Sequence, residues 1–198
     1  MATAFRRKGS RVVGRLDEQE RGIVAGLLSS TRELLDPDAD ETGDTDETAD
    51  PLERLRRELD APTATPEEVE QRDPALRRLL PPASRDDDDL ARDFRALTED
   101  SLRRRKVATI TAAIAALDSA TSDKVELDLG QAQALMMALS DVRLVLGERL
   151  GLRTDEDSAR LEQIVAEADD FEDPAVMAAM IYDLLTWLQE SVAQALLR

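Results

Sequence analysis

The chain has 198 residues, which is enough for one domain with a sizeable hydrophobic core. Its 43 Asp and Glu outnumber its 26 Lys and Arg, and the resulting net charge of −17 makes nucleic acid and anionic membranes unexpected partners for the molecule as a whole. The absence of His and Cys excludes Ser-His-Asp and thiolate catalysis, thiolate iron–sulfur centres and ordinary zinc sites, so we expect no cofactor and no enzymatic activity.

The first 15 residues are basic and include no acidic side chain. Gly9-Ser10 could form the turn of a short β-hairpin that joins Phe5 to Val12 and Val13. This segment lacks the apolar stretch of a signal peptide, and no run elsewhere is long and apolar enough to span a bilayer. We therefore expect a soluble, cytoplasmic protein. The basic residues of this segment are Arg6, Arg7, Lys8, Arg11 and Arg15.

Asp17 and Glu20 have the spacing of a capping box, and apolar residues at helical spacing follow them. This pattern predicts a helix that ends before Asp36-Pro37. Residues 1–36 would then form an N-terminal unit, made of the hairpin segment and the first helix, that packs on the remainder of the chain.

Residues 37–50 are predicted to be a disordered acidic linker, because they hold no large apolar residue to bury. Part of this segment resembles a calcium-binding loop. On the EF-hand template from Asp38, however, the fifth position is Thr42 and the twelfth is Ala49, where a bidentate Glu is required. We therefore interpret the segment as a solvated linker and not as a metal site.

Residues 51–198 are predicted to form the main helical bundle. A helix is expected over 51–60, and a short one follows Asp73-Pro74. The apolar residues of 90–97 and of 107–117 lie on nearly opposite sides of a helical wheel. This favours one long helix that changes its packing partner halfway, and a break near residues 98–101 is the alternative.

Three further helices complete the predicted bundle. Asp128 and Gln131 form a second capping box, and Gly151 is placed to end that helix in the left-handed conformation. A shorter helix over 158–168 would turn Leu161, Ile164 and Val165 inward, and Asp173-Pro174 would begin the last one. The predicted inward stripe of the last helix, with Trp187 at its edge, is Met177, Met180, Ile181, Leu184, Leu188, Val192 and Ala195.

The stretch ALSDVRLVLGERLGL, residues 138–152, is apolar on more than one side, which is typical of a helix at the centre of its domain. Its main stripe includes Leu139, Val142 and Leu146, and a second apolar strip holds Met137 and Leu144. The candidate interaction surface is this second strip with its acidic flank, and the alternative is that another helix of the domain covers it. The candidate residues are Met137, Asp141, Leu144 and Glu148.

Two residues of this stretch need a separate explanation. A glycine inside a helix costs about 1 kcal/mol relative to alanine, so Gly147 is expected to permit a close helix crossing. Arg143 would reach over that crossing to a carboxylate on a neighbouring helix, and the alternative is that it binds a partner.

The segments DPALRRLLPPASRDDDDLARDFRALTEDSLRRRK and ALSDVRLVLGERLGL resemble a family of small, all-α actinobacterial proteins known only as a domain of unknown function. DVRLVLGERLG is the most specific element, although the family usually has Asn where this chain has Ser140. The resemblance implies no activity. It implies a gene beside that of the adaptor that feeds substrates to the Clp protease, and some members are labelled transcriptional regulators.

The sequence thus predicts an all-α, single-domain bundle of about five to six helices with a short N-terminal hairpin. The leading hypothesis is a non-enzymatic interaction or accessory module that binds a protein partner. The Clp machinery is a candidate partner, and a homo-oligomer is left open. One alternative is a transcriptional regulator that uses the basic clusters at 6–15 and 103–106. The other is a magnesium-dependent nucleotide hydrolase that uses Glu162, Glu167 and 169–170.

Overall fold

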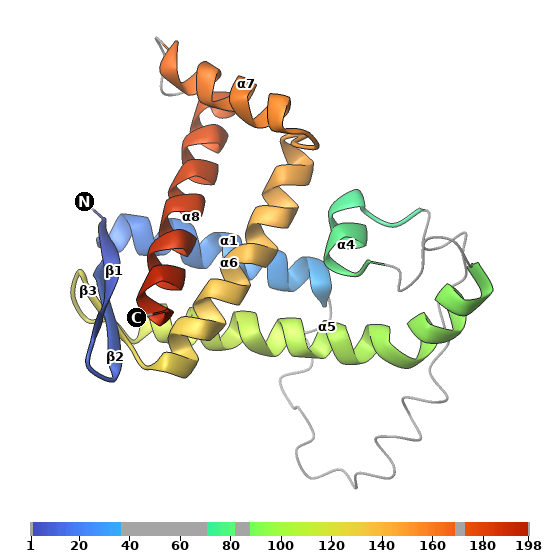
Figure 1. Ribbon diagram of the computed structural model, residues 1–198, viewed down its shortest axis with the longest axis horizontal. Coiled ribbons are helices and arrows are strands. Elements are labelled where there is room, and N and C mark those ends of the chain that lie inside the picture. The colour runs from blue at the N-terminus through green and yellow to red at the C-terminus, as the bar shows by residue number, and fades with distance from the viewer. Residues whose placement is uncertain (1, 37–70, 82–87, 169–172, 198) are drawn as a thin grey trace, which may run out of the picture.

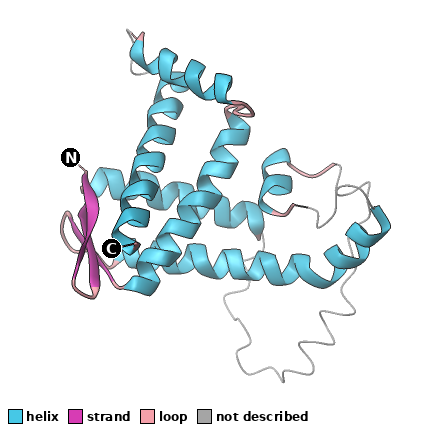
Figure 2. Cartoon of the chain, in the orientation of Figure 1, coloured by secondary structure: helices cyan, strands magenta, loops and turns pink. Residues whose placement is uncertain are grey.

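The computed structural model describes residues 2–36, 71–81, 88–168 and 173–197, without the side chains of 88–97, 155 and 162. Six helices and one three-stranded antiparallel sheet make up these residues, so the expected mainly helical fold with a short hairpin is confirmed (Figures 1 and 2). In chain order the elements are β1 (Thr3–Lys8), β2 (Arg11–Arg15), α1 (Glu18–Leu35), α4 (Pro74–Leu79), α5 (Asp88–Asp118), β3 (Lys124–Leu127), α6 (Leu129–Arg149), α7 (Asp155–Ala166) and α8 (Pro174–Leu196).

The helix boundaries follow from local hydrogen bonding. Asp17 and Asp128 cap α1 and α6 in complete capping boxes, each accepting a hydrogen bond from the backbone N–H three residues later. At the far end of α6, Gly151 has φ 70°, and the backbone N–H of Leu152 donates to the Gly147 carbonyl oxygen at 2.8 Å. These bonds are those of a Schellman ending, so the predicted start and stop of this helix are confirmed.

The N-terminal hairpin is also confirmed, and it belongs to a larger sheet than the sequence predicted. Gly9 has φ 63° in the turn, and Arg6 lies opposite Val13 on the neighbouring strand. β3 adds to the free edge of β2 with Val125 and Leu127 turned into the core. Its four residues alternate between polar and apolar side chains, at the lower length limit for identifying a strand from sequence.

Phe5 anchors the hairpin to the helices. Its side chain is 2% exposed and lies directly under Gly14, where an added Cβ would come within 2.8 Å of the ring. Its backbone N–H donates to the hydroxyl of Ser191 on α8 at 3.2 Å. The glycine of β2 therefore makes room for the one aromatic ring that connects sheet and bundle.

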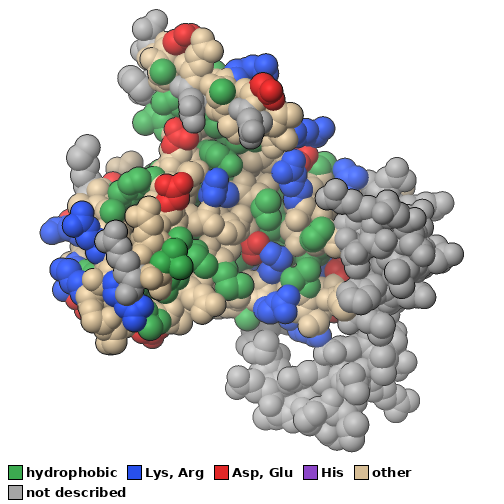
Figure 3. All heavy atoms as spheres, viewed as in Figure 1, with side chains coloured by type: hydrophobic (Ala, Val, Ile, Leu, Met, Phe, Trp, Pro, Cys, Tyr) green, Lys and Arg blue, Asp and Glu red, His purple; other side chains and the backbone are tan. Residues whose placement is uncertain are grey.

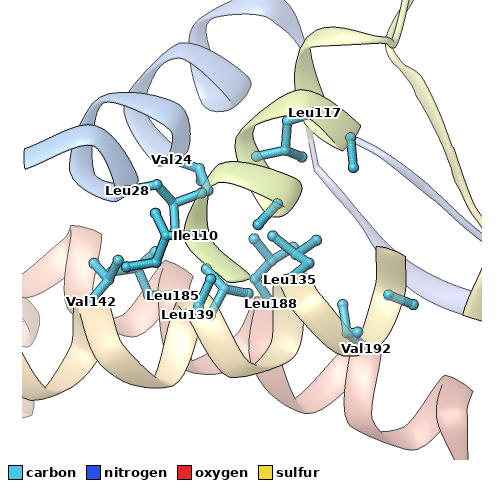
Figure 4. Packing of buried hydrophobic residues seen from close by; sticks show 14 of the residues in the cluster. Val24, Leu28, Ile110, Leu117, Leu135, Leu139, Val142, Leu185, Leu188 and Val192 are labelled. Carbon is cyan, nitrogen blue, oxygen red and sulfur yellow. The ribbon is translucent and has the colours of Figure 1, made fainter. Parts of the chain in front are cut away.

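The core lies where α1, α5, α6 and α8 meet, and α5 continues as one helix through residues 98–101. Figure 4 shows side chains from all four helices converging, among them Ile110 of α5 and Leu139 of α6, which are fully buried. The predicted single long helix is therefore confirmed. The side chains of α5 are described only from Thr98 onward, so the apolar residues of 90–97 and their predicted packing partner stay a prediction.

The last two helices differ in detail from the predicted ones. α7 begins at Asp155 and not at the predicted Ser158, because Thr154 and Asp157 form a capping box that starts the helix earlier. Ile164 is 40% exposed, so its predicted inward position is wrong.

The predicted inward stripe is wrong in the first half of α8, where Met177 and Met180 are 48% and 44% exposed. Val176, Ala179 and Leu185 are buried there instead. The neighbours of α8 change along its length, since α7 crosses its first turns and β1 its last ones (Figure 1). A single straight stripe therefore does not describe its buried face.

Three expectations lie outside the described residues: the acidic linker over 37–50, its comparison with a calcium loop, and the helix over 51–60. The described helices include none that is long and apolar enough to cross a membrane.

Candidate functional site

The helix α6 is the central element of the bundle, as its apolar pattern predicted. It packs against α5, α8, α4 and α1, and most of its circumference is buried. Met137 and Leu144 nevertheless remain 43% and 38% exposed. They lie seven residues apart, about two helical turns, so they form one strip along the helix that no described element covers. We call Met137 and Leu144 the α6 strip.

Beside the α6 strip, a small polar cluster joins α6 to α8. One guanidinium N–H group of Arg143 donates to the Gln189 side-chain oxygen at 2.6 Å, and another donates to the Tyr182 hydroxyl at 3.4 Å. The Gln189 amide in turn donates to the hydroxyl of Ser140 at 2.5 Å. The guanidinium carbon of Arg143 also lies 5.2 Å from the centre of the Tyr182 ring, within range of a cation–π interaction.

Arg143 therefore reaches the neighbouring helix as predicted, but its predicted partner is wrong. Its contacts are an amide and a phenol, and no described carboxylate forms an ion pair with it. Its Nε is buried and has no hydrogen-bond partner among the described residues. Among the described residues, therefore, no carboxylate neutralises the half-buried guanidinium at the side of the α6 strip.

The two acidic candidates lie elsewhere than expected. Asp141 is only 6% exposed, and its carboxylate accepts a hydrogen bond from the Lys106 ammonium of α5 at 2.5 Å. Glu148 pairs with Arg78 of α4 at 2.6 Å and with Arg153 at 3.2 Å. Both carboxylates connect α6 to other parts of the chain, so they are not exposed flanks of the α6 strip. The expected surface is therefore reduced to Met137 and Leu144, because α5 packs against α6 at Asp141 and α4 packs against it at Glu148.

The basic cluster at 103–106 also has structural contacts. Lys106 holds Asp141, and Arg103 donates to the Leu35 carbonyl oxygen at the end of α1 while it pairs with Glu99 at 3.1 Å. The contacts to Asp141 and Leu35 were not predicted, because these partners lie 35 and 68 residues away in the chain, whereas Glu99 is only one helical turn from Arg103. Arg103 and Lys106 therefore connect helices within the protein, and this reduces the number of side chains in the cluster that could contact nucleic acid.

Gly147 is buried between α6 and α8, but the crossing is not tight. A Cβ at this position would lie 3.7 Å from the Tyr182 ring and 4.0 Å from Leu152, which are ordinary van der Waals distances. The expected steric need for glycine is therefore wrong, and what remains is its poor helix propensity.

We expect the substitution Gly147→Ala to stabilise the protein by about 0.5–1 kcal/mol, because it removes a helical glycine without creating a clash. Urea unfolding followed by circular dichroism measures this change. Gly151→Ala is the matched control, and it should be destabilising because Gly151 has φ 70°. A loss of stability in Gly147→Ala would show that the crossing is tighter than these distances.

An apolar groove of about 490 Å³ runs between α1 and α6. Leu27 and Leu34 line it from α1, and Val142, Val145 and Leu146 line it from α6. These α6 residues lie on a different face of the helix from the α6 strip. Val142 and Leu146 belong to the predicted main stripe, and their spacing does not distinguish a groove from a filled core.

The described residues contain no group of three or more acidic side chains that could hold a metal ion. Of the residues considered for a magnesium site, Glu167 is exposed and accepts a hydrogen bond from Gln163 at 2.8 Å. The side chain of Glu162 and residues 169–170 lie outside the described part of the structure.

Comparison with known proteins places this fold in a family. The family model described as "Domain of unknown function (DUF2017)" matches residues 2–196, from the first strand to the end of α8. No curated protein and no solved structure matches the chain. Because the match extends over nearly the whole chain, the protein belongs to the DUF2017 family, whose domain has no assigned function.

Proposed function

We propose that this protein is a non-enzymatic helical module that binds a protein partner through the α6 strip. The observation that supports the proposal is the exposure of Met137 and Leu144 as one strip, about two turns long, on the central helix of the bundle. Leaving two large apolar side chains in water on such a helix has a free-energy cost that partner binding would remove. Hydrophobic side chains reach the surface over α6 and α8 in Figure 3.

The partner that fits this surface is an amphipathic helix with an acidic residue beside its apolar side. Two apolar contacts separated by two turns match the anchor spacing with which such helices dock in grooves. The uncompensated guanidinium of Arg143 would pair with the carboxylate of the partner, and planar bidentate pairing is what an arginine does better than a lysine. An apolar contact next to a charged one would give both affinity and orientation.

We further propose that the partner belongs to the Clp proteolytic machinery and that the protein acts in the cytoplasm as an accessory factor. The support is the resemblance to an actinobacterial family whose genes lie beside that of the Clp adaptor. This is a contextual argument and not a mechanistic one. The gene context of that family nevertheless indicates which proteins an affinity experiment should detect.

The test is affinity purification from the native lysate with mass spectrometry, comparing the wild type with Leu144→Glu. We expect components of the Clp machinery with the wild type and their loss with Leu144→Glu, since the new carboxylate would lie inside the apolar contact. Leu129→Glu is the matched control, because Leu129 is 37% exposed on the same helix against 38% for Leu144. It should retain the partner.

Two results would contradict the proposal. Recovery of the same Clp components by a folded Leu144→Glu variant would exclude the α6 strip, and their absence from the wild-type sample would exclude the Clp assignment. A second copy of the chain is the competing occupant. Sedimentation measurements in which the wild type is a dimer and Leu144→Glu a monomer would show that occupant and overturn the proposed partner.

A further inference from the structure

The outer face of the three-stranded sheet has the opposite charge to the molecule as a whole. Successive side chains of a strand point to opposite faces, and the inward positions of β2 and β3 are apolar or glycine, whereas Arg7 of β1 lies opposite the inward-pointing Val12. The outward charged residues are Arg6 and Lys8 of β1, Arg11 and Arg15 of β2, and Lys124 and Glu126 of β3. We call these residues the sheet face. It has five cations and one carboxylate in a chain whose net charge is −17.

The register of the strands concentrates this charge at the hairpin end. Lys8 lies directly opposite Arg11, an arrangement in which like charges repel. Lys124 pairs with Glu126, and Arg15 lies 3.6 Å from Asp123. No described carboxylate forms an ion pair with Arg6, Lys8 or Arg11, although acidic residues outnumber basic ones in the sequence.

The cations near Glu126 affect the pKa of its carboxyl group. Its hydrogen bond from Lys124 and the charge of that residue lower the pKa of Glu126, and the charges of Arg11 and Lys8 lower the pKa further. Figure 3 shows Lys and Arg gathered on the side of the molecule that the sheet forms, at the left of the view. The sheet face therefore has a positive potential that acts across strands.

The size of the sheet face limits the kind of anion that it can bind. Three strands about 4.8 Å apart and about five residues long span roughly 10 by 17 Å. A duplex or a membrane surface extends well beyond that area, and the net charge of −17 on the chain disfavours binding of such an extended polyanion. The sheet face also has no outward aromatic side chain on which a base could stack, because Phe5 points into the core.

We propose that the sheet face is a second docking site, independent of the α6 strip, that binds a short acidic peptide segment of a protein partner. Arg6, Lys8 and Arg11 supply the charges that recognise its carboxylates. An extended peptide that lies across the outer face of the sheet would contact these cations of the hairpin.

The test is fluorescence anisotropy of the full-length protein with a labelled peptide of about eight residues in which Glu and Val alternate. We expect saturable binding that weakens as salt is raised, and no binding of the same peptide with Gln in place of Glu. The double variant Lys8→Glu with Arg11→Glu should weaken binding by about tenfold or more, because both new charges repel the peptide.

The matched control is Arg77→Glu with Arg105→Glu, which makes the same change in net charge on exposed helical positions away from the sheet. It should change the affinity by less than about threefold, as expected for distant charges in physiological salt. Circular dichroism confirms that both double variants fold. If both variants lose affinity equally, only net charge matters and the sheet face is not the site.

Other polyanions are tested in the same assay. A short DNA duplex or vesicles with anionic lipid that bind more tightly than the peptide, with sensitivity to Lys8→Glu and Arg11→Glu, would overturn the assignment to a peptide. Failure of the Glu-Val peptide to bind at low salt would overturn the docking site altogether. Both results leave the α6 strip unaffected, since it is tested with Leu144→Glu.

Discussion

Replacing Lys106 with Met is expected to lower the free energy of unfolding by about 3 kcal/mol, because it leaves a buried carboxylate without its counter-charge. The side chain of Asp141 is 8% exposed and that of Lys106 is 19% exposed, and their charged groups lie 2.5 Å apart between α5 and α6. Urea unfolding followed by circular dichroism measures the loss. The variant tests how much this ion pair contributes to the packing of α5 against α6.

The control is Lys124→Met, which also removes a lysine from an ion pair but at an exposed position. Lys124 and Glu126 are 54% and 47% exposed, and exposed pairs contribute only about 0–1 kcal/mol. Adding Asp141→Leu to Lys106→Met should recover most of the lost stability, since an apolar pair replaces the unpaired charge. A loss of less than about 1 kcal/mol in Lys106→Met would show that Asp141 is effectively solvated.

The second large effect is expected at Phe5. Phe5→Ala should lower stability by about 3–5 kcal/mol, the usual cost of deleting a buried aromatic ring. The ring is 2% exposed, lies directly against Gly14 and is part of the hydrophobic core cluster that the described helices share. We expect the amides of β1 and β2 to lose protection in hydrogen exchange together with the fall in global stability.

Phe5→Leu is the conservative control, because it keeps an apolar side chain of smaller volume at the same place. It should cost less than about 1.5 kcal/mol. Unchanged hydrogen exchange and unchanged unfolding in Phe5→Ala would contradict the assigned role of Phe5, and would mean that the hairpin is held by its backbone bonds and by the contact to Ser191 alone.

The features predicted correctly from the sequence are those that depend on neighbouring residues. A capping box needs only residues three apart, so the starts of α1 and α6 at Asp17 and Asp128 could be predicted. A glycine with positive φ marks a turn or a helix end by itself, as Gly9 and Gly151 do. The central position of α6 followed from its apolar residues on several sides.

The features that the sequence did not predict depend on which elements meet. Asp141 looked like an exposed flank because Lys106, its partner, lies 35 residues earlier in the chain. Arg143 was expected to find a carboxylate, and it meets Gln189 and Tyr182 because α8 presents those side chains at the crossing. The exposed methionines of α8 follow in the same way from the position of α7 across its first turns.

The same distinction between local and tertiary features applies to the two candidate surfaces. The sequence by itself determined that the chain is mainly helical, and that without His and Cys it lacks the side chains for histidine, thiolate or ordinary zinc chemistry. It also identified Met137 and Leu144 as a separate apolar strip. Only the tertiary structure decided that no described element covers the strip, that no described carboxylate pairs with Arg143, and that five cations share one face of the sheet. The physical reason is that capping and periodicity act within one element, whereas burial and charge neutralisation depend on side chains that only folding brings together.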